Sequence, residues 1–339
     1  MKMKIHLVSG LLLLLITASC SQKDATKKVV SFYHWKSKAT INQQYQQALK
    51  STNTHKIYLH YFDIVSEHEA NWYDDGIFPT YVLKEVDPAY QNFEIVPVVY
   101  ITNQVFQVSN LEVQKLSNRI KDLVHQISQK HFKKDISQIQ IDCDWTESTK
   151  YAYFELLESL SDEFDLDVTI RLHQIKFKEK TGVPPVKKGT LMVYNVGDLK
   201  DFDQNSILQN SIVKQYITAD TKYPMPLNIA LPLFSQTVIK NKDNKIKIIN
   251  SVDRPTFEND KHFKQINTSQ FEVVKDTLYK GFYLSEAYGI KLEELAVTEI
   301  VDSYNTIKQS KLITNEILFY HLDKNSLSNI NLSELVEKL

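Results

Sequence analysis

The chain has 339 residues, of which 42% are hydrophobic and 24% are charged, and its formal net charge is −1. These values are typical of a folded globular protein, and they exclude a disordered chain and a multi-span membrane protein. The balanced charge gives no basic field for nucleic acid. With seven glycines and two cysteines, the chain has no glycine-rich phosphate motif and no disulfide framework. We therefore expect no cofactor, no bound metal and no nucleic-acid partner.

The chain begins with a segment that reads as a targeting signal. Two basic residues, Lys2 and Lys4, precede an apolar run over 7–16, which is too short to span a bilayer but has the length of a signal-peptide core. Small residues then lead into Cys20. This arrangement resembles a bacterial lipoprotein signal, whose cysteine becomes the lipidated N-terminus. We expect residues 1–19 to be the signal peptide and residues 20–28 a tether, which predicts a lipid-anchored protein of the bacterial cell envelope, outside the cytoplasm.

The rest of the chain, residues 29–339, alternates between strand-like and helix-like patterns. Short β-branched and aromatic runs predict eight strands, at 29–35, 56–63, 93–102, 138–145, 167–173, 189–195, 227–234 and 316–323. Helical patterns lie between them, at about 41–50, 111–131, 149–163, 205–217, 292–309 and 327–338. Eight strands alternating with helices favour an α/β fold, a single-domain (β/α)8 TIM barrel, over a doubly wound open sheet.

Two connections are long enough to be insertions, one after strand two and one after strand seven. The first covers 64–92 and contains Trp72, and the second covers 235–291. Within the second, the polar run 240–245 between two strand-like segments predicts a surface hairpin. Both insertions follow strands, so both should lie at the carboxyl-end face, where barrels build their sites.

Strand four carries the clearest candidate chemistry. Gln140, Asp142 and Asp144 alternate with apolar residues, so the polar set should point into the barrel and the apolar set toward the outer helices. On strand five, Arg171 shares a face with Thr169 and His173. An inward arginine beside two carboxylates suits bidentate pairing. The arrangement fits a polar floor beneath a ligand, or a buried ion network that only fills the barrel.

The stretch Ile141-Asp-Cys-Asp-Trp145 is similar to the strand-four motif of the family-18, chitinase-like glycoside hydrolases. Met192-Val-Tyr-Asn195 on strand six and Phe319-Tyr-His-Leu-Asp323 on strand eight also resemble motifs of that family, in the same order along the chain. The chain is most similar to bacterial lipoprotein barrels that carry Asp-x-Asp-Trp-Thr in place of the motif with the catalytic Glu. The resemblance implies a TIM barrel that acts on oligosaccharides.

The resemblance also implies catalytic roles. The inner Asp144 and Tyr194 would orient the substrate's own acetamide, with Asp142 supporting the charge of Asp144. The family's proton donor falls at Thr146, which cannot act as a general acid. The neighbouring Glu147 is the residue we expect to act as the acid if the chain turns after Trp145, with Asp144 as the fallback. The expected catalytic set is therefore Glu147, Asp144 and Asp142.

Aromatic and polar residues at the strand ends are candidates for sugar binding, because flat rings cover the CH face of a pyranose while polar groups satisfy its hydroxyls. The expected substrate-binding residues are Trp35, Trp145, Arg171, His173, Tyr194, Asn195 and Tyr320.

Three functions remain open. The first is a lipid-anchored glycoside-hydrolase-like enzyme that acts on an oligosaccharide by carboxylate acid catalysis. The second is a carbohydrate-binding lipoprotein on a degenerate hydrolase barrel. The third is a metal-dependent hydrolase that would gather His60, His173 and His321 with Asp63 or Asp323. The orientation of Glu147 separates the first two: a carboxylate in the cleft favours the enzyme, and one in solvent favours the binding protein.

Overall fold

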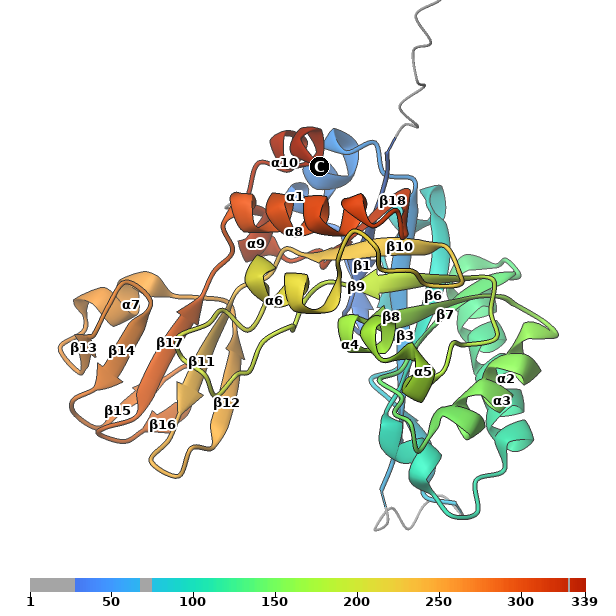
Figure 1. Ribbon diagram of the computed structural model, residues 1–339, viewed down its shortest axis with the longest axis horizontal. Helices are drawn as coiled ribbons and strands as arrows, with labels where there is room; N and C mark the ends of the chain where they lie inside the picture. The colour runs from blue at the N-terminus through green and yellow to red at the C-terminus, as the bar shows by residue number, and fades with distance from the viewer. Residues whose placement is uncertain (1–27, 68–74, 329) are drawn as a thin grey trace, which may run out of the picture.

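The computed structural model describes residues 28–67, 75–328 and 330–339, and its main body is a closed barrel (Figure 1). The barrel strands lie in the order β1-β18-β10-β9-β8-β7-β6-β3, and β1 also pairs with β3, which closes the ring. Every pairing in this ring is parallel. In chain order the strands are β1 (Val29–His34), β3 (Lys56–Ser66), β6 (Glu94–Ile101), β7 (Gln138–Asp142), β8 (Asp165–Arg171), β9 (Lys188–Met192), β10 (Leu227–Pro232) and β18 (Ile313–Tyr320). The predicted (β/α)8 barrel is confirmed.

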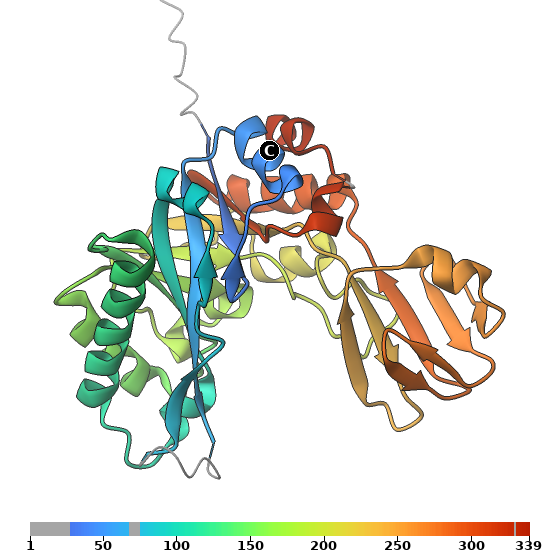
Figure 2. The same ribbon diagram turned by 180° about the vertical axis from the view of Figure 1, so that it is seen from behind.

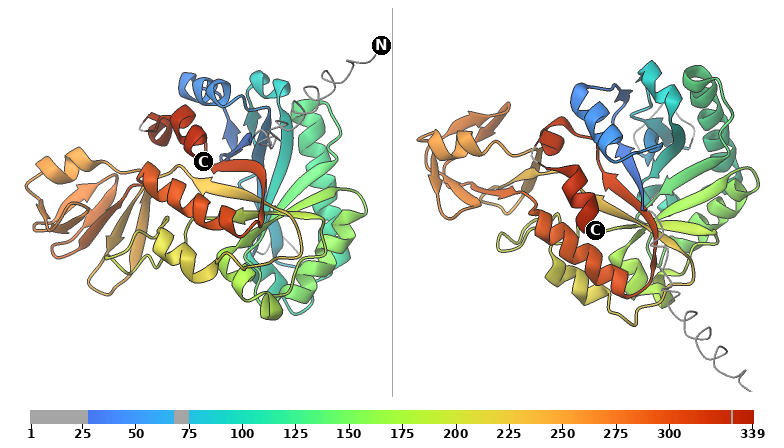
Figure 3. Two further views of the ribbon diagram at one scale, coloured as in Figure 1. Left: turned by 45° about the horizontal axis from the view of Figure 1, so that its top comes forward. Right: turned by 90° about the horizontal axis from the view of Figure 1, so that it is seen from above.

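Helices surround the barrel, as the view from above shows (Figure 3). The main hydrophobic core lies between strands and helices, and it includes Ile139 and Ile141 of β7 and Cys143, which follows it, since the strand ends at Asp142 rather than at the predicted residue 145. The predicted alternation along that strand is therefore confirmed. The α-helices outside the inserted unit are α1 (Gln43–Ser51), α2 (Val113–Phe132), α3 (Lys150–Ser161), α4 (Leu172–Lys176), α5 (Lys178–Thr181), α6 (Asn210–Tyr216), α8 (Val297–Gln309), α9 (Lys324–Ser328) and α10 (Leu332–Lys338).

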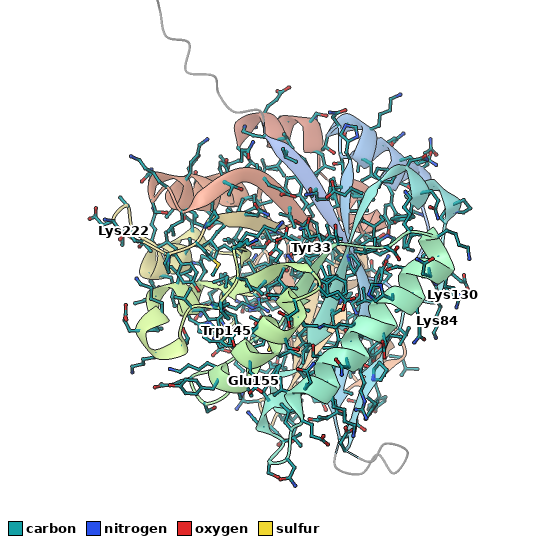
Figure 4. The ribbon with its side chains drawn as sticks, turned by 90° about the vertical axis from the view of Figure 1, so that its right-hand side faces the viewer. Tyr33, Lys84, Lys130, Trp145, Glu155 and Lys222 are labelled. Carbon is teal, nitrogen blue, oxygen red and sulfur yellow. The ribbon has the colours of Figure 1, made fainter. Side chains whose placement is uncertain are left out.

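The barrel interior is more polar than its outside. Tyr33 donates to Gln140 over 2.8 Å, Gln140 donates to Thr190 over 3.2 Å, and Thr190 donates to Asp167 over 3.0 Å. Burial and the surrounding acidic groups raise the pKa of Asp167 to about 6, against the hydrogen bonds that it accepts. Figure 4 labels Tyr33 in the middle of the barrel. Tyr33, Gln140, Thr190 and Asp167 thus form one series of buried hydrogen-bonded side chains, as burial of polar groups requires.

The insertion after the second barrel strand is short. β4 (Ile77–Thr80) extends β3 as an antiparallel partner, and β5 (Glu85–Val86) pairs with β2 (Lys38–Ala39). Two 3-10 turns, η1 (Pro88–Asn92) and η2 (Asn103–Gln107), flank β6. Trp72 lies outside the described residues, so its expected place in this loop stays a prediction.

The insertion after the seventh barrel strand is a folded β unit beside the barrel (Figures 1 and 2). It contains a five-stranded antiparallel sheet in the order β12-β11-β17-β14-β13. A separate core cluster packs one face of this sheet. The unit consists of β11 (Gln236–Lys240), β12 (Ile246–Asn250), α7 (Arg254–Asn259), β13 (Phe263–Gln265), β14 (Gln270–Val273), β15 (Thr277–Tyr279), β16 (Phe282–Leu284) and β17 (Gly289–Glu293). The predicted hairpin over 240–245 is the turn between β11 and β12.

Two expected helices begin later than the sequence pattern predicts. The helix expected over 205–217 starts at Asn210, because residues 205–209 form a loop that bonds to the insertion. The helix expected over 292–309 starts at Val297, because Leu292 and Glu293 complete β17. Both differences arise from contacts with the inserted sheet, which helical periodicity does not reveal.

Residues 1–27, which include the expected signal peptide, Cys20 and nearly all of the tether, lie outside the described part of the chain. Within the described part, no helix has the length and apolar character needed to cross a membrane.

Candidate functional site

A large cleft opens at the carboxyl ends of the barrel strands, bounded on one side by the insertion. Its volume is about 1110 Å³, which exceeds that of most small-molecule pockets and suits an oligomer. Side chains from six of the eight barrel strand ends and from the insertion contribute. The lining residues include Trp35, Lys36, Asp144, Trp145, Thr146, Arg171, His173, Asn195, Ser206, Phe234, Gln236, Ile248, Asn250, Tyr320, His321 and Asp323.

An ion pair lies on the barrel side of the cleft. Arg171 Nε donates to Asp144 Oδ1 over 2.6 Å, and its Nη2 donates to Asp144 Oδ2 over 3.1 Å. Arg171 Nη1 also donates to the Tyr194 carbonyl over 3.3 Å. This two-point contact fixes the plane of the Asp144 carboxylate. The structure thus brings the predicted Asp144 and Arg171 together, with Asp144 in the role of a paired anion.

Asp142 lies below this pair, inside the barrel and away from the cleft lining. It is 5% exposed and accepts a hydrogen bond of 2.6 Å from Thr169. Burial raises the pKa of the Asp142 carboxyl to about 6, and the nearby Asp144 adds to the shift while Arg171 opposes it. Asp142 is therefore an acid that can hold a proton in mildly acidic solution.

Aromatic rings form the cleft floor. Trp35, Phe234 and Tyr320 are half-buried and line it. Tyr194 lies beneath them, 2% exposed and stacked on Tyr320 with ring centroids 4.7 Å apart. The buried Tyr194 hydroxyl has no hydrogen-bond partner among the described residues. Asn195, next along the chain, lines the cleft with a left-handed backbone (φ 54°), a conformation that Asn tolerates better than most residues.

Trp35 rests on a histidine that the sequence pattern did not assign to the site. The Trp35 and His60 ring centroids are 4.7 Å apart. His60 Nε2 in turn bonds to Asp63 Oδ1 over 2.6 Å. The sequence pattern predicts His60 and Asp63 only as candidate metal ligands. In the structure Asp63 bonds to His60, and the His60 ring packs against the floor residue Trp35.

The turn after the fourth barrel strand places Thr146 and Glu147 differently. Thr146 lines the cleft at the position where the resemblance puts the proton donor, and its hydroxyl lies 3.0 Å from that of Ser148. Glu147 is exposed and lies outside the set of cleft-lining residues. The structure therefore does not bring Glu147 together with Asp144 in the cleft, and its role as the acid stays a prediction that this placement weighs against.

Trp145, a predicted binding residue, lies in other surroundings than expected. The Trp145 side chain is fully buried, its ring stacks on Tyr153 of α3 at 5.1 Å, and its Nε1 donates to the Thr181 carbonyl. Figure 4 shows it close to that helix. The Trp145 ring thus belongs to the outer core, in line with the strand alternation. Trp145 lies at the cleft lining, but at 0% exposure its ring offers no surface to a ligand.

His173 does not continue the fifth barrel strand, which ends at Arg171. Arg171 N donates to Gln174 Oε1 over 2.7 Å, and this bond turns the chain into α4. His173 stands exposed at the cleft rim, where partial burial lowers the pKa of its ring, against the opposite effect of Asp144. The prediction that His173 shares the inner strand face of Thr169 and Arg171 is therefore wrong.

Residues of the insertion and of the loop after the sixth barrel strand complete the cleft. Ser206 lies on that loop before α6, Gln236 begins β11, and Ile248 and Asn250 lie on the edge strand β12. No motif in the sequence marks them, since they reach the cleft only where the loop packs against the insertion. The same holds for Phe234, which follows the seventh strand. Among the described residues, no three His, Cys, Asp or Glu side chains form a group able to hold a metal ion.

Comparisons with known proteins concern the fold alone. No family model and no curated protein matches the chain. Its trace is similar to that of a spore cortex-lytic enzyme, SleL of Bacillus cereus, with a TM-score of 0.49 and 12% identity, covering 92% of this chain and 74% of that one. It is also similar to a chitinase of Rhizomucor miehei, with a TM-score of 0.47 and 10% identity, covering 91% of this chain and all of that one. These neighbours are chitinase-like glycoside hydrolases. The barrel has the topology that the sequence resemblance implies.

Proposed function

We propose that this protein is a lipid-anchored, extracytoplasmic barrel that binds a neutral oligosaccharide without cleaving it. The observation that carries the proposal is the composition of the cleft. Aromatic floor residues and neutral polar groups are present, while Thr146 occupies the position of the family's proton donor. The alternative of a hydrolase that uses Glu147 receives no support from the exposed position of that side chain.

The charges of the cleft favour a neutral ligand. Among the described lining residues the cations and anions pair with each other: Arg171 with Asp144 at 2.6 Å, and Lys36 with Asp323 at 3.8 Å. His173 has a lowered pKa, so it adds little positive charge near neutral pH. A ligand with carboxylate or phosphate groups would find no unpaired cation there, whereas sugar hydroxyls and amides suit the available hydrogen-bonding groups.

The chain direction supports an outward-facing cleft. All barrel strands are parallel, so the amino end of β1 at Val29 lies on the face opposite the cleft. A lipid on Cys20 would precede Val29 by nine residues, a span of at most about 30 Å. Anchored in this way, the barrel would hold its cleft away from the membrane, toward soluble or polymeric glycans.

Calorimetric titration of the chain from Ser21 onward tests the binding function. N-acetylated and plain neutral oligosaccharides are compared with uronate-containing ones of the same length. We expect saturable binding of a neutral series and at least about tenfold weaker binding of the acidic one. Tyr151→Ala, an exposed tyrosine outside the cleft (77% exposed), serves as the control for Trp35→Ala. Absence of binding to any neutral oligosaccharide would refute the proposal.

Hydrolysis is the second candidate, because Asp142 has an acid pKa of about 6 next to the paired Asp144. Because Asp142 lies below the cleft lining, its proton would act on the ligand only through Asp144, the fallback acid, whose charge Asp142 and Arg171 influence. In this case turnover should rise as the pH falls toward 6, and Asp142→Asn should abolish it while Glu147→Gln should not. No turnover at any pH would leave the binding function alone.

Anchoring is tested separately by fractionating cells that express the full chain. We expect the protein in the membrane fraction, and Cys20→Ser should move it to the soluble fraction or block its processing. Equal distribution of both proteins would contradict lipidation.

A further inference from the structure

A buried ion pair joins the insertion to the loop over 195–209, which follows the sixth barrel strand. Lys291 and Glu293 lie two residues apart on β17, so both point to the sheet face opposite the insertion's own core. They are 2% and 1% exposed. Lys291 Nζ lies 2.7 Å from Glu293 Oε1. Charged side chains are almost never this buried without a dedicated set of partners.

The partners of Glu293 are two residues that line the cleft. Its Oε1 accepts from the Ser206 backbone N–H over 2.7 Å, and its Oε2 accepts from the Ser206 hydroxyl over 2.6 Å. Its Oε2 also accepts from the Gln236 amide over 2.6 Å, and that amide lies 3.2 Å from the Ser206 hydroxyl. One carboxylate thus fixes two cleft side chains from separate segments.

The partners of Lys291 are backbone carbonyls of the same loop. Its Nζ donates to Asp201 O over 2.8 Å and to Gln204 O over 3.1 Å. Two further bonds join the loop to the insertion, from Gln270 to the Phe202 carbonyl and from Asn205 to the Glu294 carbonyl, each 2.8 Å long. The loop, which also supplies Gly197 and Leu199 to the cleft, is therefore attached to the insertion over residues 201–206.

We propose that Lys291 and Glu293 are positioning residues of the cleft, which hold Ser206 and Gln236, 2% and 5% exposed, as fixed parts of the wall against which the ligand lies. A buried ion pair contributes little net stability, because the cost of removing both charges from water offsets their attraction. The pair instead fixes geometry, because the two oxygens of the Glu293 carboxylate accept hydrogen bonds from Ser206 and Gln236 in a single arrangement of these side chains. The insertion then acts as a fixed cleft wall. The part of this inference that concerns the ligand rests on the proposed oligosaccharide binding.

The test replaces the pair with apolar residues of similar size, as Lys291→Met with Glu293→Leu in one chain. Single variants would leave one buried charge unpaired and would lower stability, so the double variant is the informative one. The control is Lys338→Met with Glu334→Leu, an exposed pair on α10, 50% and 54% exposed. Amide hydrogen exchange of the Ser206 region is measured without ligand, and oligosaccharide affinity is measured by titration.

We expect the double variant to unfold at a lower urea midpoint than the wild type, because the buried Ser206 and Gln236 donors lose their acceptor, and amide exchange around Ser206 should become about tenfold faster or more. Affinity for the neutral oligosaccharide should fall about tenfold. The single variant Lys291→Arg, which keeps the positive charge beside Glu293, should retain part of the wild-type exchange protection. The exposed-pair control should change neither quantity. Wild-type exchange at Ser206 in the double variant would overturn the inference, whether or not any sugar binds. Faster exchange with unchanged affinity would overturn its ligand part alone, and a failure of the wild type to bind sugar would count only against the proposed function.

Discussion

The two sides of the cleft are built by different means. On the barrel side, Arg171 and Tyr320 end β8 and β18 and Asp144 follows β7, so the parallel hydrogen-bonded ladder of the barrel sets their spacing. On the insertion side, Ser206 and Gln236 come from a loop and an antiparallel strand, and one buried carboxylate sets their positions. The barrel side therefore depends on the fold as a whole, whereas the insertion side depends on a few polar bonds that a single substitution can break.

The largest expected effect lies on the barrel side, at Arg171. Arg171→Met leaves Asp144 and the buried Asp142 without their counter-ion. We expect a loss of about 2–3 kcal/mol in the free energy of unfolding, below the range for fully buried pairs because Asp144 is 46% exposed. Urea unfolding at pH 7 measures it. Lys188→Met, at an exposed pair with Asp165 (3.4 Å), should cost less than about 1 kcal/mol. Equal losses in both variants would show that the Arg171 pair is energetically an ordinary surface contact.

The next effect is a pH dependence that originates in the barrel interior. The pKa values of Asp142 and Asp167 are raised to about 6 in the folded chain, so the folded state holds more protons than the unfolded state between about pH 4 and 6. Their contribution therefore makes the protein more stable as the pH falls from 7 toward 4. We expect Asp167→Asn to raise the free energy of unfolding at pH 7 by about 2 kcal/mol and to flatten the profile. A profile identical to that of the wild type between pH 4 and 7 would contradict the assignment.

Ligand contacts should differ between the two sides. Trp35→Ala removes an aromatic floor ring and should weaken oligosaccharide binding by about 2 kcal/mol. Asn250→Ala, on the edge strand of the insertion, removes one polar contact and should weaken it by less than about 1 kcal/mol. Titration of both variants with the same oligosaccharide gives the comparison. A larger effect at Asn250 would place the main binding surface on the insertion.

The smallest effect tests the packing of the insertion wall. A Cβ at Gly289 would lie 3.2 Å from the Phe202 ring, so Gly289→Ala must push that ring and the loop that carries it by a few tenths of an ångström. We expect a loss of about 1 kcal/mol and faster amide exchange in the loop, with barrel exchange unchanged. Altered exchange in the barrel strands would show that the wall is not a separate unit.

The barrel side was predictable from the sequence because its signals are local. Alternation placed Gln140, Asp142 and Asp144 inward and Cys143 in the outer core, where the structure has it. The assignment of Trp145 to sugar binding went against the same alternation, and the structure has this ring in the outer core. The end of strand five at Arg171 was not predictable. The bond from the Arg171 N–H to Gln174 starts a helix there and turns His173 away from the expected face.

The insertion side could not be read from the sequence because its contacts are distant in the chain. Ser206 and Glu293 are 87 residues apart, and nothing in either local pattern indicates the other. A lysine and a glutamate at alternate strand positions usually mark a solvated face, and only the covering loop turns Lys291 and Glu293 into a buried pair. The helix expected from 205 onward is shortened for the same reason.

The most direct test of the central claim is product analysis by mass spectrometry. The chain from Ser21 onward is incubated with a saturating neutral N-acetylated oligosaccharide, between pH 5 and 8, under conditions in which titration shows the ligand bound. We predict that the ligand is recovered intact at every pH, because Thr146 supplies no proton. Shorter products that disappear in the Asp142→Asn variant would contradict the account and identify the protein as a hydrolase.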